Sequence, residues 1–290
     1  MPNLFEAART NPSFNRLEIG GFLFAEYTCG VTDKFITNWS ETDYFVHILT
    51  GRKSWHTTDG IWRAAPGDTI FFKKGANIVE QHFEDHVCLL MLFFPDALLR
   101  ATIREIVSAL DLQPNHSTPG RTTIRVENEI TLTAFFDSMR TYLLGNARPP
   151  EPLVQLKLKE LVMSVLTSRA NAELAAYFQR LGTSDAPLLA EIMEANFRYN
   201  LSLEAYAKLC HRSLSSFKRE FQAQFAESPG KWLLQRRLDH AARRLQDAQL
   251  NVTEVALESG FEDVSHFSRV FKERFGVPPL AFREKAPTAS

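Results

Sequence analysis

The chain has 290 residues, of which 44% are hydrophobic and 23% are charged, and its formal net charge is −1. This length allows a sizeable core and predicts about two domains. The small net charge excludes a protein that is basic over its whole surface, as a nonspecific nucleic-acid coat would be.

The N-terminal residues 1–14 contain no hydrophobic core of the signal-peptide type. The longest apolar run, Val87–Phe94, is far shorter than the roughly 20 residues of a membrane helix. Cys29, Cys88 and Cys210 show no metal or redox spacing, so we expect buried free thiols in a reducing compartment. These features together predict a cytoplasmic protein without a membrane segment.

Residues 1–95 are expected to form a β domain. Short runs rich in aromatic and β-branched residues occur between residues 17 and 94, separated by turns that contain glycine. Closely spaced antiparallel strands of this kind predict a sandwich or a small barrel. The side chains expected to face its interior are Trp39, Phe45, His47, Trp55, Trp62 and Phe72.

Residues 96–182 are expected to be helical, because apolar residues recur there at helical spacing. The expected helices and their Pro-rich breaker cover residues 96–110, 130–144, 147–152 (the breaker) and 153–168. Residues 183–187 are the expected linker to a third region, 188–290, whose first helix lies within residues 187–200.

The third region contains one short pattern twice, at Leu203–Pro229 and at Val252–Pro279. Matching positions hold the same residue type and are Ala207 and Ala256, Phe217 and Phe267, Arg219 and Arg269, Phe221 and Phe271, Phe225 and Phe275, and Pro229 and Pro279. Two copies indicate a duplicated supersecondary unit rather than a solenoid, which needs three or more repeats.

Each copy predicts a helix, a tight turn and a second helix, which is the helix-turn-helix arrangement. Ser213 and Asp263 stand at the expected N-caps of the second helices, where a side-chain oxygen accepts a hydrogen bond from an unpaired backbone amide. Gly260 lies at the turn of the second copy, where a left-handed residue is favoured. The second helix of such a unit can lie in the major groove of DNA.

Polar side chains on the second helices are the candidate base contacts. Opposite the phenylalanine face these helices carry Ser215, Lys218 and Arg219 in the first copy and Ser265, His266 and Arg269 in the second. Arginine can donate two hydrogen bonds to guanine, and the other residues can donate to base edges or phosphates. A solvated helix face is the alternative for one copy, but an arginine at the same position of both copies favours DNA contact.

Phosphate contacts are expected from a local basic patch. Residues 205–244 contain nine Lys or Arg and three Asp or Glu, an excess of six positive charges, which is enough to displace counterions from a phosphate backbone. The candidate phosphate-binding residues are Arg212, Lys231, Arg236, Arg237 and Lys272. The second copy is more acidic, so we expect it to contribute less affinity.

The run Ser213–Phe221 and the run GFEDVSHFSRVFKERFGVPPLAFR, from Gly260 to Arg283, resemble the DNA-binding domain of the AraC/XylS family of bacterial transcription regulators. The resemblance covers the C-terminal third of the chain. It implies two units joined by one long helix, for which residues 236–248 have the right place, and recognition helices in successive major grooves roughly 34 Å apart. Ser215 and His266 depart from the commoner residues of the family's pattern.

The N-terminal region is similar to the cupin-type jelly roll of many regulators of this family. The similarity rests on the turn from Gly51 to Trp55 and on the run APGDTIFFKKG at residues 65–75. Such domains bind a small effector, bind a regulatory protein or dimerise. The candidate effector-binding residues are Trp39, His47, Trp55, Lys73 and Lys74, with core packing as the alternative for the aromatic residues and a solvated loop for the lysines. The effector itself is unknown.

Cupins also include metal-dependent enzymes, which hold their ion with a clustered pair of histidines, a glutamate and a later histidine. Only His47 stands where the pair is expected, and residues 73–77 lack the later histidine. The side chains that would share one face of an extended segment are Glu80, His82, Glu84 and His86. A metal site needs three or four converging ligands, so we expect no metal, no cofactor and no catalysis. A metal-dependent cupin enzyme with an accessory DNA-binding domain is the alternative.

The predicted fold class is α+β, with an N-terminal cupin-like β jelly roll, a helical dimerisation region, and a C-terminal all-α domain of two helix-turn-helix units joined by a long helix. The predicted function is a sequence-specific, double-stranded-DNA-binding transcription regulator, and an activator because activation is the commoner mode in the resembling family. Expected partners are promoter DNA, RNA polymerase and a second copy of the chain. The helices of residues 96–182 either pack on the barrel or form the dimer interface, and dimerisation is favoured because bivalency raises affinity.

Overall fold

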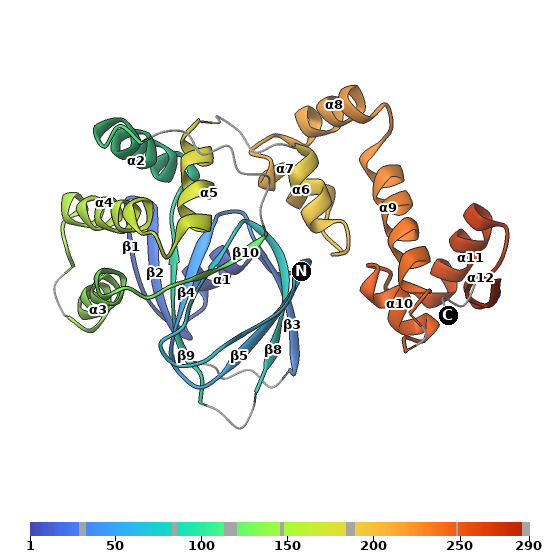
Figure 1. Cartoon of the computed structure of the whole chain (residues 1–290), viewed down its shortest axis with the longest axis horizontal. Helices are drawn as coiled ribbons and strands as arrows, with labels where there is room; N and C mark the ends of the chain where they lie inside the picture. Colours follow the sequence, from blue (N-terminus) through green and yellow to red (C-terminus); the bar gives the residue numbers. More distant parts are fainter. Residues whose placement is uncertain are drawn as a thin grey trace. The chain divides into compact units, whose positions relative to one another are not determined.

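The computed structural model describes residues 1–28, 33–82, 86–112, 121–145, 148–183, 189–247 and 249–285. The chain divides into two compact units, Met1–Pro187 and Leu188–Ser290 (Figure 1). The first unit contains β-sheets and helices, and the described part of the second unit contains helices without a strand, which confirms the predicted α+β class. The described residues include no helix with the length and apolar character that a bilayer crossing requires.

Two antiparallel sheets form the framework of the first unit. One sheet has the strand order β1-β2-β9-β4-β7-β10 and the other the order β3-β8-β5-β6. The strands are β1 (Phe14–Ile19), β2 (Phe22–Thr28), β3 (Phe35–Ser40), β4 (Tyr44–Thr50), β5 (Lys53–Thr57), β6 (Gly60–Ala64), β7 (Thr69–Phe72), β8 (Gly75–Gln81), β9 (Cys88–Phe93) and β10 (Thr123–Val126).

An aromatic core fills the space between the two sheets. The Tyr44 ring stacks on Phe72 and on Phe93, with centroid distances of 5.0 and 5.1 Å. Trp55, from the other sheet, lies 5.4 Å from Phe72. These residues belong to one buried cluster that contains side chains of both sheets, so burial of apolar surface holds the sheets together.

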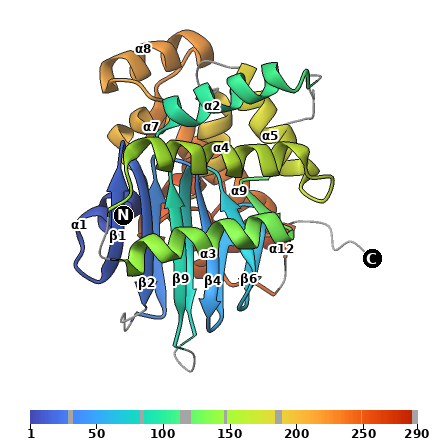
Figure 2. The same ribbon diagram turned by 90° about the vertical axis from the view of Figure 1, so that its left-hand side faces the viewer.

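Helices cover the other face of the larger sheet, as Figure 2 shows for α3 and α4. The helices of this unit are α1 (Leu4–Thr10), α2 (Asp96–Ala109), α3 (Ile130–Leu144), α4 (Glu151–Thr167) and α5 (Ala172–Thr183). Buried residues of α2 to α5 join Phe45 and Phe71 of the sheet in a second hydrophobic cluster. Both faces of the larger sheet are therefore buried.

The helical region differs from the prediction at two places. Helix α4 begins at Glu151, inside the expected breaker, because Pro152 lies in the first turn, where a proline removes no helical hydrogen bond. Residues Thr123–Val126 form β10, which pairs with β7 and places Thr123 opposite Phe72. The region expected to be helical thus supplies an edge strand of the larger sheet. Most of the expected linker, residues 184–187, and Cys29 lie outside the described residues.

The second unit consists, in its described residues, of α6 (Leu189–Asn196), α7 (Leu203–Leu209), α8 (Leu214–Phe225), α9 (Pro229–Arg244), α10 (Val252–Glu258), α11 (Val264–Phe275) and α12 (Pro279–Lys285). The helix pairs α7–α8 and α10–α11 coincide with the two copies of the repeat. The connecting helix α9 begins at Pro229 rather than at Arg236, because Ser228 caps it and Pro229 is suited to the first helical position. It ends at Arg244.

Candidate nucleic-acid interface

Buried aromatic residues fix the two predicted recognition helices, α8 and α11. Phe217 and Phe221 of α8 are fully buried, and so are Phe267 and Phe271 of α11. Within each helix these residues lie one turn apart, so they share one face. The same face of each helix is therefore turned into the protein, and the opposite face is left for solvent or a ligand.

The start of each recognition helix is also fixed, by a side-chain cap. The Ser213 hydroxyl accepts a hydrogen bond from the Ser216 amide at 3.2 Å. The Asp263 carboxylate accepts from the amides of Ser265 and His266 at 2.7 and 3.2 Å. Both predicted N-caps are confirmed. The cap orients the first turn, which carries the side chains that a recognition helix presents to base edges.

All six predicted base-contacting side chains are exposed; they are Ser215, Lys218, Arg219, Ser265, His266 and Arg269. The side chain of Arg219 makes no hydrogen bond or ion pair with the residues that the structure describes. Arg269 donates to Glu273 at 3.4 Å, and the two side chains are 66% and 62% exposed. An exposed ion pair of this kind contributes little to the stability of the fold. The Arg269 guanidinium can therefore exchange Glu273 for another acceptor.

Lys231 and Lys272 are the two predicted phosphate-binding residues that remain exposed to solvent. Lys231 lies in the first turn of α9, and its amide donates to the Ser228 cap at 3.4 Å. The positive end of a helix dipole and a lysine together favour an anion such as a phosphate.

Arg212 and Arg236 are already engaged within the protein. The Arg212 guanidinium donates to the Glu220 carboxylate and ties the turn between α7 and α8. Arg236 donates to Glu194 at 2.5 Å, and its guanidinium lies 5.7 Å from the Trp232 ring centroid. Either arginine must release a partner before it contacts phosphate.

Arg237 has a structural environment that the sequence did not reveal. Its Nε donates to the Phe197 carbonyl at 2.7 Å and its Nη2 to the Tyr199 carbonyl at 2.9 Å. Burial lowers the pKa of this guanidinium, and Tyr206 and Glu262 oppose that shift. Because two backbone carbonyls hold the guanidinium in place and the side chain is half-buried, the geometry disfavours direct phosphate contact by Arg237. In the sequence, Arg237 is one basic residue among several, and nothing there indicates that it binds backbone carbonyls.

His47, a candidate effector residue, does not face the space between the sheets, so the predicted inward position is wrong. Its Nδ1 lies 2.8 Å from the Thr69 hydroxyl, and its ring stacks on Phe136 of α3 at 4.8 Å. Residues 44, 46 and 48 face the space between the sheets, whereas Phe45 and His47 alternate toward the helices. Burial is the main cause that lowers the pKa of His47.

The candidate effector lysines pack against the protein. The buried Lys74 ammonium lies 3.2 Å from the Asp96 carboxylate. The Lys73 ammonium lies 4.4 Å above the Tyr177 ring, and burial, with Arg180, lowers its pKa. The remaining candidates, Trp39 and Trp55, are 7% and 3% exposed. None of the five candidates lines the surface pocket at the turn between β1 and β2.

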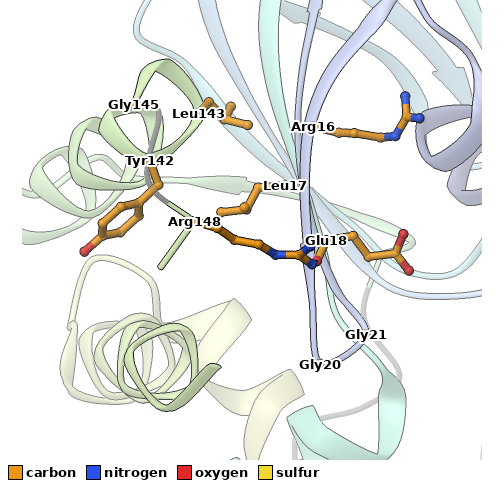
Figure 3. Close-up of a pocket in the computed structure, with 9 residues that line it drawn as sticks. All are labelled: Arg16, Leu17, Glu18, Gly20, Gly21, Tyr142, Leu143, Gly145 and Arg148. Carbon is orange, nitrogen blue, oxygen red and sulfur yellow. The ribbon is translucent and has the colours of Figure 1, made fainter. Parts of the chain in front are cut away.

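A surface pocket of about 570 Å³ lies elsewhere on the first unit, next to the turn between β1 and β2 (Figure 3). Its lining includes Arg16, Glu18, Tyr142 and Arg148. The side chains do not converge: Arg148 reaches the Glu18 carbonyl, to which it donates, whereas Arg16 points away from Tyr142. The sequence analysis did not identify this pocket.

Two of the candidate metal ligands have other polar partners in the structure. His82 lies 2.8 Å from the Ser54 hydroxyl, and Glu80 lies 2.9 Å from His56. Glu84 lies outside the described residues. Among the residues that are described, no three of the types His, Cys, Asp and Glu form a group suited to a metal ion. The described geometry thus lends no support to the metal-enzyme alternative.

Comparisons with known proteins find a matching domain family in each of the two units. Residues 43–177 match the family described as the ExsA N-terminal regulatory domain, and residues 206–285 match a helix-turn-helix domain. The virulence regulon transcriptional activator VirF of Yersinia enterocolitica is 24% identical over 81% of this chain and 87% of its own. The transcriptional regulator ExsA of Pseudomonas aeruginosa is 23% identical over 82% of this chain and 84% of its own. A structure of ToxT from Vibrio cholerae is 13% identical, with a TM-score of 0.43 over 91% of this chain and 98% of that one. The chain therefore belongs to the AraC/XylS family and is a DNA-binding regulator of transcription.

Proposed function

We propose that the protein activates transcription by binding specific double-stranded DNA through two helix-turn-helix units, α7–α8 and α10–α11, joined by α9. The observation that carries the proposal is the repeated exposed arginine. Arg219 and Arg269 occupy the same position of α8 and α11, on the side opposite the buried phenylalanines. Arginine in this place can read guanine in the major groove. Activation is supported by VirF, which is a transcriptional activator.

In this proposal each recognition helix reads one major groove. Ser215, Lys218 and Arg219 contact bases in the first groove, and Ser265, His266 and Arg269 contact bases in the next. Lys231 and Lys272 contact phosphates, because both are exposed cations on the elements that flank or form the recognition helices. Arg212 and Arg236 join them only after they release Glu220 and Glu194.

We assign the first unit to sensing and dimerisation. The cupin-like jelly roll comprises residues 1–95 together with β10, the helices of residues 96–182 provide the dimer contact, and residues 183–187 lead to the DNA-binding domain at 188–290. Apolar side chains exposed on α3 and α4 support the dimer contact; they include Ile130, Leu156 and Met163. The aromatic core between the sheets favours an effector that binds the outer surface. The chain then acts in the cytoplasm, with promoter DNA and RNA polymerase as partners.

A DNA titration tests the function. The full chain is titrated with DNA from upstream of its own gene and of neighbouring genes, at two salt concentrations. Tight binding to one fragment, weakened in both Arg219→Ala and Arg269→Ala but not in Gln224→Ala, is the expected result. Uniform, strongly salt-dependent binding that neither arginine affects would refute the base-reading assignment.

The alternative of a metal-dependent enzyme has its own measurement. Elemental analysis of the dialysed protein would have to find stoichiometric zinc, iron or manganese. A metal-free protein that binds its DNA with full affinity leaves the regulatory function as the one that the geometry supports.

A further inference from the structure

In the DNA-binding unit, helices α6 to α8 form the first half, helices α10 to α12 form the second half, and α9 connects them. The two halves meet at the loop of residues 197–200, between α6 and α7. Its carbonyl groups follow the C-terminal end of α6, where backbone oxygens lack helical partners. Arg237, from the middle of α9, donates to the carbonyls of Phe197 and Tyr199 at 2.7 and 2.9 Å. A cationic donor at a helix C-terminus is favourable for charge as well as for hydrogen bonding. Arg237 thus fastens the first half of the unit to the connecting helix.

The turn between α10 and α11 contacts the same loop from the other half. A Cβ at Gly260 would lie 2.5 Å from the Arg198 carbonyl oxygen and 3.0 Å from the Arg237 Nε. Gly260 also adopts a φ of +87°, which favours glycine. The backbone of the second half can therefore approach the loop this closely only because residue 260 has no side chain.

Polar and aromatic contacts surround this approach. The Asn200 amide donates to the Glu262 carboxylate at 2.6 Å. The His240 ring, on α9, lies 5.7 Å from the Phe197 ring, and its Nδ1 lies 3.0 Å from the Ser259 hydroxyl. The loop is thus held by α9 on one side and by residues 259–262 on another.

We propose that this contact, centred on Arg237 and Gly260, fixes the separation and rotation of the two recognition helices and so sets the half-site spacing that the protein accepts on DNA. Arg237 is a positioning residue in this inference, which rests on the proposed function. Helix α9 also packs against each half through apolar side chains: Trp232 lies against Phe221 of the first half, and Leu238, Ala241 and Leu245 belong to the core of the second half. The loop contact adds a direct link between the two halves at one point of α9, which restricts their rotation relative to each other.

The spacing of half-sites is the quantity that such a contact controls. Each base pair added between two half-sites rotates the second one by roughly 35°, because B-DNA has about 10 base pairs per turn. A protein whose two halves are held rigidly then loses the DNA contacts of one recognition helix. A protein whose halves pivot independently can follow the rotated half-site and keeps part of those contacts.

The test uses the full chain and the operator found by the DNA titration, together with operators that have one base pair inserted or removed between the half-sites. We expect the wild-type protein to lose roughly 100-fold in affinity at either altered spacing, as for the loss of one specific half-site. Arg237→Gln should reduce that discrimination to less than about tenfold, and Arg237→Lys should lie between, since an ammonium is a point donor that does not match two acceptors as a planar guanidinium does.

Arg243→Gln, at an exposed arginine of α9 outside the proposed contacts, is the charge-matched control and should keep the wild-type spacing preference. Glu262→Ala, at the exposed edge of the contact, provides a second variant whose spacing preference should also weaken even if Arg237→Gln fails to fold. Thermal unfolding shows which variants are folded.

Three results would overturn the inference. The first is that Arg237→Gln weakens binding at every spacing by one common factor and flattens the salt dependence, which identifies a phosphate contact. The second is that folded Arg237→Gln and Glu262→Ala both keep the full wild-type discrimination. The third is that the wild-type protein binds its operator tightly yet accepts all spacings. Failure of the proposed function is distinct from these results, because the wild-type protein would then prefer no DNA sequence at all.

Discussion

Ala226 and Gly276 occupy the same position after α8 and α11, and both adopt the left-handed conformation, with φ of +57° and +77°. An L-residue in this conformation costs about 1–2 kcal/mol. Replacing it by glycine removes that cost, but part of the gain is lost because glycine has the larger chain entropy in the unfolded state. We therefore expect Ala226→Gly to raise the free energy of unfolding by about 0.5–1 kcal/mol. Gly276→Ala, the reciprocal change, should lower it by a similar amount. Urea unfolding of the full chain measures both, and a neutral or destabilising Ala226→Gly would contradict this account.

Arg219→Ala and Arg269→Ala should each weaken binding to the operator by about 1–3 kcal/mol and relax base preference at one position. The reason is the loss of a bidentate donor to a base edge from an exposed helix face. Competition with operators that carry one changed base pair measures both effects. Gln224→Ala, an exposed α8 residue outside the predicted set, should bind as the wild type does.

Lys231→Ala should affect DNA binding differently from Arg219→Ala and Arg269→Ala. A phosphate contact carries no base information, so affinity should fall by one factor on all sequences, and the slope of log affinity against log salt should decrease by about one. Lys34→Ala, at an exposed lysine of the first unit, is the charge-matched control. A loss confined to the specific operator would show that Lys231 reads a base.

The lowered pKa of His240 should be visible in the pH dependence of the free energy of unfolding. Burial, reinforced by Arg198, Arg243 and Arg244, lowers its pKa from 6.5 to about 4. Between these values the unfolded chain binds more protons at this position than the folded chain, so the free energy of unfolding should fall as pH decreases through this window. His240→Gln should make that decline less steep. Urea unfolding across the window measures the slope.

Apolar residues exposed on α4 should matter for dimerisation. Leu156 and Met163 are 61% and 43% exposed, and a lysine at either position would place a charge in an apolar contact. Sedimentation equilibrium should show a dimer for the wild type and a dissociation constant raised roughly tenfold or more in Leu156→Lys and Met163→Lys. Leu257→Lys, at an exposed residue of the second unit, should leave the dimer intact. A monomeric wild type at all concentrations would remove this assignment.

Local sequence patterns predicted much of the fold. The apolar spacing of residues 130–144 gave the bounds of α3, and the repeat gave α7–α8 and α10–α11 with both N-caps. These features depend on residues close together in the chain, where periodicity and capping are informative. The six candidate base contacts followed from the same helical spacing, and the structure exposes all of them.

Features that depend on distant residues escaped the sequence. Strand β10 has only four residues and exists because it pairs with β7. His47 was placed on the wrong face because β4 is apolar on both sides, so alternation cannot tell which side faces the helices. Arg237 looked like one more cation of a basic patch, because its carbonyl acceptors belong to a loop 38 and 40 positions earlier in the chain.

The edge position of β10 has a consequence for dividing the protein. A fragment that ends at residue 95 would lack the strand that covers β7 and would leave one row of backbone amides and carbonyls of β7 unpaired at the rim of the larger sheet. An open edge flanked by apolar side chains recruits strands from other chains. Such a fragment would self-associate through its backbone, so its aggregation would report the cut rather than the oligomeric state of the intact regulator.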